Sequence, residues 1–197
     1  VSSSKQRLLL VILTAGRPTS LVRLFKSLLR VDYADTAVDV LIHVDRDQDQ
    51  RPHYRTVELA QRFSWPHGAK QIVVESERIG LRRSWLSVSP RSVHAHVVIL
   101  EDDIEVSPQF YKFFKLVRES DLLMRSTAVC LHPSDWELKV IAERECESDE
   151  VPGVRFYFAP EPCNWGPIWS STEWQRFKHW ARNLETNGNQ PFTPPEI

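Results

Sequence analysis

Five short runs of apolar residues are spaced along the first two thirds of the chain. They are LLLVIL at 8–13, VDVLIHV at 38–44, QIVV at 71–74, VVIL at 97–100 and AVCL at 128–131. Runs of this length that are rich in Val, Ile and Leu are typical of strands covered on both faces. The pattern therefore predicts five buried strands.

Helical patterns occupy the segments between these runs. The first begins at Pro18 and repeats apolar residues at i, i+3, i+4 and i+7, namely Leu21, Leu24, Phe25 and Leu28. Further helices are predicted from about Pro52 to Phe63, over 81–87 and after Pro108. Because strands alternate with helices, we expect an α/β single domain with a mainly parallel sheet flanked by helices.

Composition and charge narrow the classes of partner. The chain has 197 residues, of which 42% are hydrophobic and 26% charged, as in ordinary globular domains. Its 25 basic and 26 acidic side chains leave a net charge of -1, so no overall field favours nucleic acid or an anionic membrane. No apolar run reaches the roughly 18 residues of a membrane span. We therefore expect no nucleic acid partner, and a membrane association only through an anchor outside this chain.

Three cysteines, Cys130, Cys146 and Cys163, lack the CxxC spacing and the paired His of structural zinc sites. Their spacing leaves a disulfide open, for example one between Cys146 and Cys163. It does not identify the pair.

Polar residues follow each of the first four apolar runs. They are Thr14, Asp45, Glu75 and the acids Glu101 to Asp103. Ligands of open α/β sheets bind beyond the carboxyl ends of the strands, so we expect these side chains to converge on one edge. The alternative is that each strand simply ends in solvent.

Three consecutive acids, Glu101, Asp102 and Asp103, form the most unusual of these strand ends. The two-residue period of a strand would place Glu101 and Asp103 on one side and Asp102 on the other. Without a cation, neighbouring carboxylates repel and their pKa values rise. Hard divalent ions bind such carboxylates together with phosphate and water. We interpret the cluster as a cation site, with a solvated strand end as the alternative.

Several other phosphate-binding and hydrolytic motifs are missing from the sequence. It contains no GxxxxGK[ST], no GxGxxG after the first strand and no GxSxG. The turn TAGRPTS at 14–20 offers one Gly, one Arg and the start of a helix, which suits an anion or a ribose. Of the phosphate chemistries considered, metal-assisted chemistry on a diphosphate compound remains.

The segments TAGRP, IHVD, RIGLRRS, VVILEDDIEVSP and CNWGPIW, in this order, resemble a GT-A fold glycosyltransferase of the family 2 type. They are also similar to the N-acetylglucosaminyltransferase I group. The likeness covers about residues 8–180 and is most specific at EDDIEVSP. It implies a GT-A (Rossmann-like) sheet and metal-dependent transfer of a sugar, with inversion, from a nucleotide-diphosphate donor to a hydroxyl of a glycan, lipid or protein acceptor.

The resemblance also implies roles for individual residues. It places Asp103 on a Mn2+ (or Mg2+) ion that bridges the donor diphosphate, with Glu101 and Asp102 nearer the ribose and the sugar. It places Asp45 at the nucleoside base or ribose. The other implied nucleotide-sugar contacts are Thr14, Arg17, Arg78, Gly80, Arg83, Trp165 and Gly166. Guanidinium groups bind phosphate oxygens in a bidentate manner, which supports a role for at least one Arg of RIGLRRS.

The catalytic base is harder to place. In the family it follows the donor-covering loop by some tens of residues, near or beyond Ile197 in this numbering. Glu173 is the candidate within the chain, although a position at a helix start equally fits a contact with the helix dipole. We therefore expect residues 1–197 to form a nucleotide-sugar-binding domain that is truncated at its C-terminus.

Two alternatives stay open. One is a domain that binds nucleotide-sugar and metal without turnover. The other is a sugar nucleotidyltransferase, which shares the sheet and the metal but needs a Gly-rich basic loop after the first strand. Family likeness favours the Golgi or secretory-pathway lumen as the location, with the cytoplasm as the alternative.

Overall fold

The computed structural model describes residues 7–34, 37–120, 122–131, 145–147, 155–157 and 165–187. Its main strands are β1 (Arg7–Thr14), β2 (Val38–Val44), β3 (Lys70–Val74), β4 (His94–Glu101), β5 (Ala128–Val129) and β8 (Ile168–Ser170). Its helices are α1 (Pro18–Leu29), α2 (Tyr54–Arg62), α3 (Gly80–Ser87), α4 (Phe110–Glu119), α5 (Leu122–Arg125) and α7 (Ser171–Asn187). Among these helices, none has the length and apolar character needed to cross a bilayer.

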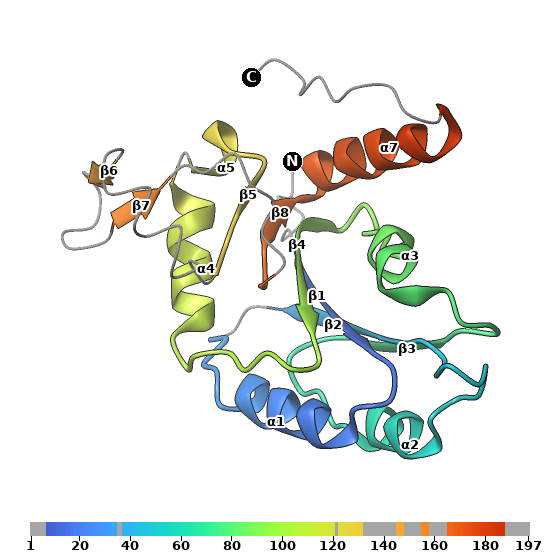
Figure 1. Ribbon diagram of the computed structural model, residues 1–197. Coiled ribbons are helices and arrows are strands. Elements are labelled where there is room, and N and C mark those ends of the chain that lie inside the picture. Colours follow the sequence, from blue (N-terminus) through green and yellow to red (C-terminus); the bar gives the residue numbers. More distant parts are fainter. Residues whose placement is uncertain are drawn as a thin grey trace.

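The six strands form one sheet in the order β3-β2-β1-β4-β8-β5 (Figure 1). β3, β2, β1 and β4 are parallel to one another, whereas β8 runs antiparallel to both β4 and β5. β6 (Glu145–Glu147) and β7 (Arg155–Tyr157) form a separate antiparallel pair. The architecture is thus the mixed α/β domain with a mainly parallel sheet that the sequence predicts.

The first three predicted strands agree with the observed ones to within one residue at each end. β1 extends the predicted 8–13 by one residue at each end, and β2 has the predicted bounds. The fifth predicted strand shrinks to the two residues of β5, which pair with β8. β8 itself was not predicted, because three residues are too few to produce a recognisable apolar run.

β1 illustrates how the sheet is covered on both faces. Its even-numbered residues from Leu8 to Ile12 belong to the core shared with α1, α2 and α4. Its odd-numbered residues from Leu9 to Leu13 belong to a second core that includes Trp174 of α7, with Phe177 of α7 and Trp85 of α3 packed against it. The domain therefore has three layers, and its loops meet at the two ends of the strands.

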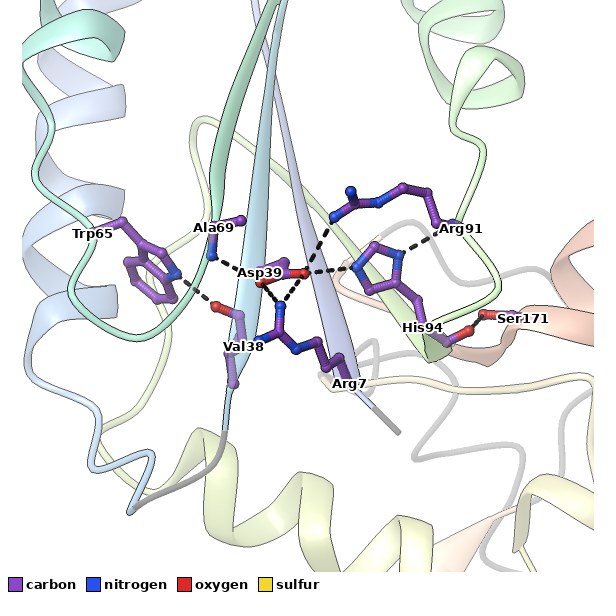
Figure 2. A network of polar contacts seen from close by, with 8 residues as sticks. All are labelled: Arg7, Val38, Asp39, Trp65, Ala69, Arg91, His94 and Ser171. Atoms are coloured by element: carbon purple, nitrogen blue, oxygen red, sulfur yellow. Dashed lines mark hydrogen bonds and ion pairs between the residues drawn. The ribbon is translucent and has the colours of Figure 1, made fainter. Parts of the chain in front are cut away.

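A buried carboxylate ties the strands together at their amino-terminal ends (Figure 2). Asp39 is 2% exposed. It accepts hydrogen bonds from Arg7 Nη1 at 3.1 Å, the Ala69 N–H at 2.8 Å, His94 Nε2 at 3.0 Å and Arg91 Nη2 at 3.4 Å. Burial raises the pKa of Asp39, but the Ala69, His94 and Arg7 contacts together bring it below its usual value. This cluster fixes the edge opposite the acids.

Cys130 is disulfide-bonded. Because the chain has only two other cysteines, a bond between Cys146 and Cys163 would leave Cys130 without a partner. The suggested Cys146–Cys163 pair is therefore wrong. The side chains of these two cysteines lie outside the described residues.

Candidate functional site

The polar strand ends lie side by side, as the parallel topology requires. Beyond the last strand residues, the Asp45 N–H donates to the Thr14 carbonyl at 2.8 Å and the Asp102 N–H donates to the Leu13 carbonyl at 3.1 Å. The Glu75 N–H continues the ladder to the carbonyl of Val44 at 2.9 Å. The predicted convergence on one edge of the sheet is therefore observed.

Arg17 joins the turn after β1 to the acids after β4. Its Nη1 donates a 2.6 Å hydrogen bond to Oδ2 of Asp103, and its Nη2 lies 2.6 Å from Oδ1 of Asp102. The Asp102 contact is an ion pair without the alignment of a hydrogen bond. One guanidinium thus partly compensates two carboxylates, a contact that the sequence reasoning missed.

The backbone around Arg17 directs its side chain toward the acids. Arg17 precedes α1 with φ −114° and ψ 66°, and its side chain makes no capping hydrogen bond to the helix. Its carbonyl accepts the Leu21 N–H at 3.1 Å, while Pro18, which lacks an N–H, opens the helix. The backbone of Arg17 is thus held by α1, whereas its guanidinium belongs to the site.

Asp102 is the buried member of the acidic group. Its side chain has no exposed surface, and its Oδ2 accepts a 2.6 Å hydrogen bond from the Thr14 hydroxyl. Burial is the main reason why the pKa of Asp102 is raised, and the charge of Asp103 adds to it. We expected raised pKa values from mutual repulsion, but desolvation is the larger cause.

Glu101 is held by a residue that the sequence did not mark. Trp85 of α3 donates a side-chain hydrogen bond to Glu101, which lowers the pKa of this carboxyl. Burial has the larger and opposite effect, so the pKa of Glu101 is raised overall. Only the packing of α3 against the sheet reveals this contact.

A pocket of about 760 Å³ opens beside the acids. Glu101 and Asp103 both line it, whereas Asp102 faces Thr14, which matches the alternation expected from a strand period. The other lining residues are Ile104, Glu105, Val106, Ser107, Gln109, Phe110, Phe113, Leu131 and Trp165. A concave site with apolar walls and a few polar groups is typical of small-molecule binding.

Gly166 shapes the backbone next to Trp165 at this pocket. Its φ is +71°, and a Cβ at this position would come within 2.8 Å of Leu131 Cδ1 and 3.1 Å of Leu100 Cδ2. Both the left-handed backbone and the close packing require glycine here. Trp165 itself is 46% exposed at the pocket wall.

Asp45 anchors the start of α3. Its carboxylate accepts the N–H groups of Arg46 at 2.8 Å, Ile79 at 3.0 Å and Gly80 at 2.8 Å. These bonds use three of about four lone-pair positions on the carboxylate. The geometry favours a structural role for Asp45, and its predicted contact with a base or ribose stays a prediction.

The RIGLRRS segment begins at the same edge. Gly80 has φ +79°, and no atom lies within 4 Å of the position that a Cβ would take. The Arg78 N–H donates to Oε1 of Gln50 at 2.6 Å, and the Arg78 and Arg83 side chains are exposed. Contacts of Arg78 and Arg83 with a diphosphate therefore stay predictions that the geometry allows.

Glu173 lies at the wrong end of the sheet for the predicted base. It follows β8, whose Ser170 pairs with His96, five residues before Glu101 in β4. At about 3.3 Å per residue, this separation is roughly 16 Å. Figure 1 shows α7 leaving β8 at the top of the view, whereas the β4–α4 loop crosses the lower half. Glu173 instead pairs with Arg176 at 2.8 Å.

The donor set limits how a cation would be held. Among the described residues, no group of three or more His, Cys, Asp or Glu side chains forms a metal cluster. Asp103 is 48% exposed and offers the hard oxygen ligand that Mn2+ and Mg2+ prefer. The residues therefore fit an ion that takes its remaining ligands from a diphosphate and water, not an ion held by protein alone.

No protein-family model and no curated protein sequence matches the chain. Solved structures do match. The mannosyltransferase PcManGT from Pyrobaculum calidifontis, in complex with GDP-Man and Mn2+, has a TM-score of 0.58 and 16% identity, over 97% of this chain and 55% of that one.

S. aureus TarS 1-349 gives a TM-score of 0.51 at 12% identity, over 92% of this chain and 49% of that one. Its complex with UDP gives 0.54 at 11% identity, over 92% and 48%. The chain thus spans about half the length of these proteins. At such identities the likeness concerns the fold, and the chain has the mixed α/β fold of GT-A-like glycosyltransferases.

Proposed function

We propose that the chain is the nucleotide-sugar-binding domain of a metal-dependent glycosyltransferase. The observation that carries this proposal is the assembly of Thr14, Arg17, Asp102 and Asp103 at the carboxyl edge of the sheet, beside the 760 Å³ pocket. Open α/β sheets bind their ligands at this edge. The structural neighbours, one with GDP-Man and Mn2+ and one with UDP, support a nucleotide-sugar donor.

Each part of the site has a distinct task in this proposal. Asp103 holds the cation, and Arg17, Arg78 and Arg83 bind the phosphate oxygens of the donor. Bound Mn2+ or Mg2+ would supply positive charge that stabilises the departing nucleoside diphosphate. Glu101 and Trp165 line the pocket that takes the donor sugar.

The acceptor hydroxyl of a glycan, lipid or protein then attacks the anomeric carbon, with inversion. The base that removes its proton must come within hydrogen-bond reach. The position of Glu173 beside Arg176 does not suit this task. Inversion and transfer of a hexosyl or N-acetylhexosaminyl group rest on the resemblance to the N-acetylglucosaminyltransferase I group.

The same position of Glu173 favours a second candidate, a domain that binds donor and metal without turnover. The two candidates share every contact on the donor side. They differ in whether a base reaches the acceptor, so product formation separates them.

A secretory-pathway lumen is the proposed location. The disulfide of Cys130 supports it, because disulfides form and persist in oxidising compartments and are rare in the cytosol.

Thermal unfolding with a panel of nucleotide-sugars, each with and without Mn2+, tests the donor site. A ligand that binds the folded state stabilises it by RT ln(1 + [L]/Kd), where [L] is the free ligand concentration, and so raises the unfolding temperature. We expect Asp103→Ala to abolish the Mn2+-dependent shift while the apo protein stays folded. Glu119→Ala, which removes an exposed carboxylate paired with Arg118 on α4, is the matched control.

Equal Mn2+-dependent shifts in Asp103→Ala and the wild type would contradict the metal site. Release of nucleoside diphosphate from a stabilising donor, with transfer to an acceptor, would favour the enzyme. Stabilisation without product, over a panel of acceptors, would favour the binding domain.

A further inference from the structure

We propose that Arg17 is an internal counter-cation that competes with the divalent ion for Asp103. In this view Arg17 holds the acids together before the metal arrives and must leave Asp103 when it binds. The inference rests on the proposed function, because it concerns the same cation site. It makes Arg17 a positioning residue. Removing Arg17 should raise the affinity for the metal, whereas removing a metal ligand lowers it.

The two contacts of Arg17 are unequal in burial. Asp102 is fully buried and is fixed on its other oxygen by the Thr14 hydroxyl. Asp103 is 48% exposed and lines the pocket, so water or a ligand can reach it. The Asp103 contact is therefore the exchangeable one, whereas the Asp102 contact retains the guanidinium near the site.

Arg17 and a divalent ion cannot share Asp103 without repulsion. Nη1 of Arg17 already lies 2.6 Å from Oδ2 of Asp103. A Mn2+ or Mg2+ ion on that carboxylate would lie about 2.1 Å from an oxygen. Two like-charged groups would then stand within a few ångströms of each other, where Coulomb repulsion stays considerable even in a watery environment.

Arg17 has the freedom to move that this exchange requires. Its side chain is 53% exposed, and its backbone is fixed independently by the carbonyl bond to the Leu21 N–H. A guanidinium released from Asp103 binds phosphate oxygens well. When the metal displaces Arg17 from Asp103, the incoming diphosphate would therefore give Arg17 a new partner.

Titration with Mn2+ alone, followed by electron paramagnetic resonance, tests the exchange without any sugar or turnover. We expect Arg17→Gln to bind Mn2+ roughly tenfold more tightly than the wild type, because a competing charge has been removed. Arg23→Gln is the matched control. It removes an equally exposed charge of α1 that pairs with Glu105 at 3.5 Å, not with Asp102 or Asp103.

Arg17→Lys provides a second variant, in case the loss of all charge beside buried Asp102 destabilises the fold. Lysine keeps the charge but lacks the fork that spans two carboxylates, so we expect intermediate Mn2+ affinity. Thermal unfolding of each apo variant identifies those that are folded for the titration.

The outcomes separate this inference from the proposed function. Suppose that the wild type binds Mn2+ through Asp103 and that Arg17→Gln and Arg17→Lys bind it equally well or more weakly. This result would overturn the role of Arg17 and leave the metal site intact. An increase of the same size in the Mn2+ affinity of Arg23→Gln would also overturn the role of Arg17, since the effect would then come from the overall charge of the protein. Absence of Mn2+ binding in every variant, with and without UDP or GDP, would overturn both proposals.

Discussion

The hydroxyl of Thr14 donates a 2.6 Å hydrogen bond to the buried carboxylate of Asp102, a residue 88 positions later in the chain. This bond joins the first strand to the acidic strand end at its least accessible point. It lets Asp102 remain buried while Asp103 faces the pocket. Thr14 therefore holds Asp102 on the side away from the pocket, in addition to any contact with a nucleotide.

Thr14→Val tests this support. Valine has nearly the same shape but no hydroxyl, so it leaves an oxygen of buried Asp102 without its donor. We expect the free energy of unfolding to fall by about 1–3 kcal/mol, the usual cost of an unsatisfied buried polar group. Urea unfolding at neutral pH measures it. Thr14→Ser keeps the hydroxyl and should lose clearly less, so equal losses would show that the hydrogen bond is unimportant.

Glu101→Gln should stabilise the apo protein at neutral pH. Burial raises the pKa of Glu101 from its usual 4.5, so the folded state retains a proton that the unfolded state has released. Ionisation therefore opposes folding as the pH rises from about 4.5 through the folded-state pKa. The stability difference between variant and wild type should be absent below pH 4.5 and grow above it.

Glutamine still offers an oxygen to Trp85, so the variant removes the charge with little change in packing. Unfolding curves from pH 4 to 8 would show this trend. A wild type that gains stability over Glu101→Gln as the pH rises would contradict the sign.

Asp39→Asn should weaken the opposite end of the sheet. Asparagine keeps the shape but removes the charge that faces Arg7, Arg91 and His94 (Figure 2). Removing one partner of a buried ion pair typically costs about 3–5 kcal/mol. Glu58→Gln, which affects an exposed pair with Arg62, is the control and should change stability by less than about 1 kcal/mol.

The loss in Asp39→Asn should also depend on pH. Because the pKa of Asp39 is below its usual 3.8, its contribution is present above pH 3.8 and is lost as the pH falls through the folded-state value. The difference from the wild type should therefore be present at neutral pH and should shrink as the pH falls below about 3.8. A difference that vanishes at neutral pH would contradict the role of the charge.

Gly166→Ala should destabilise the pocket wall. A Cβ would lie 2.8 Å from Leu131 Cδ1, and φ is +71°, a conformation that costs an ordinary residue about 1–2 kcal/mol. We expect a loss of at least that size in thermal or urea unfolding. Gly16→Ala is the control, since its Cβ would meet only the His53 ring at 3.6 Å. Equal losses at the two positions would contradict the packing argument.

The sequence predicted the elements whose pattern is local. β2 has the predicted bounds, and α3 begins one residue before the predicted 81–87. β8 escaped prediction, because its three residues are too few to form a recognisable apolar run and only pairing with β4 and β5 identifies them as a strand. Glu173 was the candidate base within the chain, but the antiparallel direction of β8 carries it to the other edge.

The sequence by itself determined that the main strands are parallel and that their polar ends meet at one edge, because hydrophobic periodicity and the alternation of strands with helices can be read along the chain. Only the tertiary structure decided what those polar residues touch. Arg17 contacts two acids that lie 85 and 86 positions away in the chain. Asp45 accepts a hydrogen bond from the backbone at the start of α3 and does not simply end its strand in solvent. Side-chain partners depend on direction and burial in the folded domain, which no spacing along a chain records.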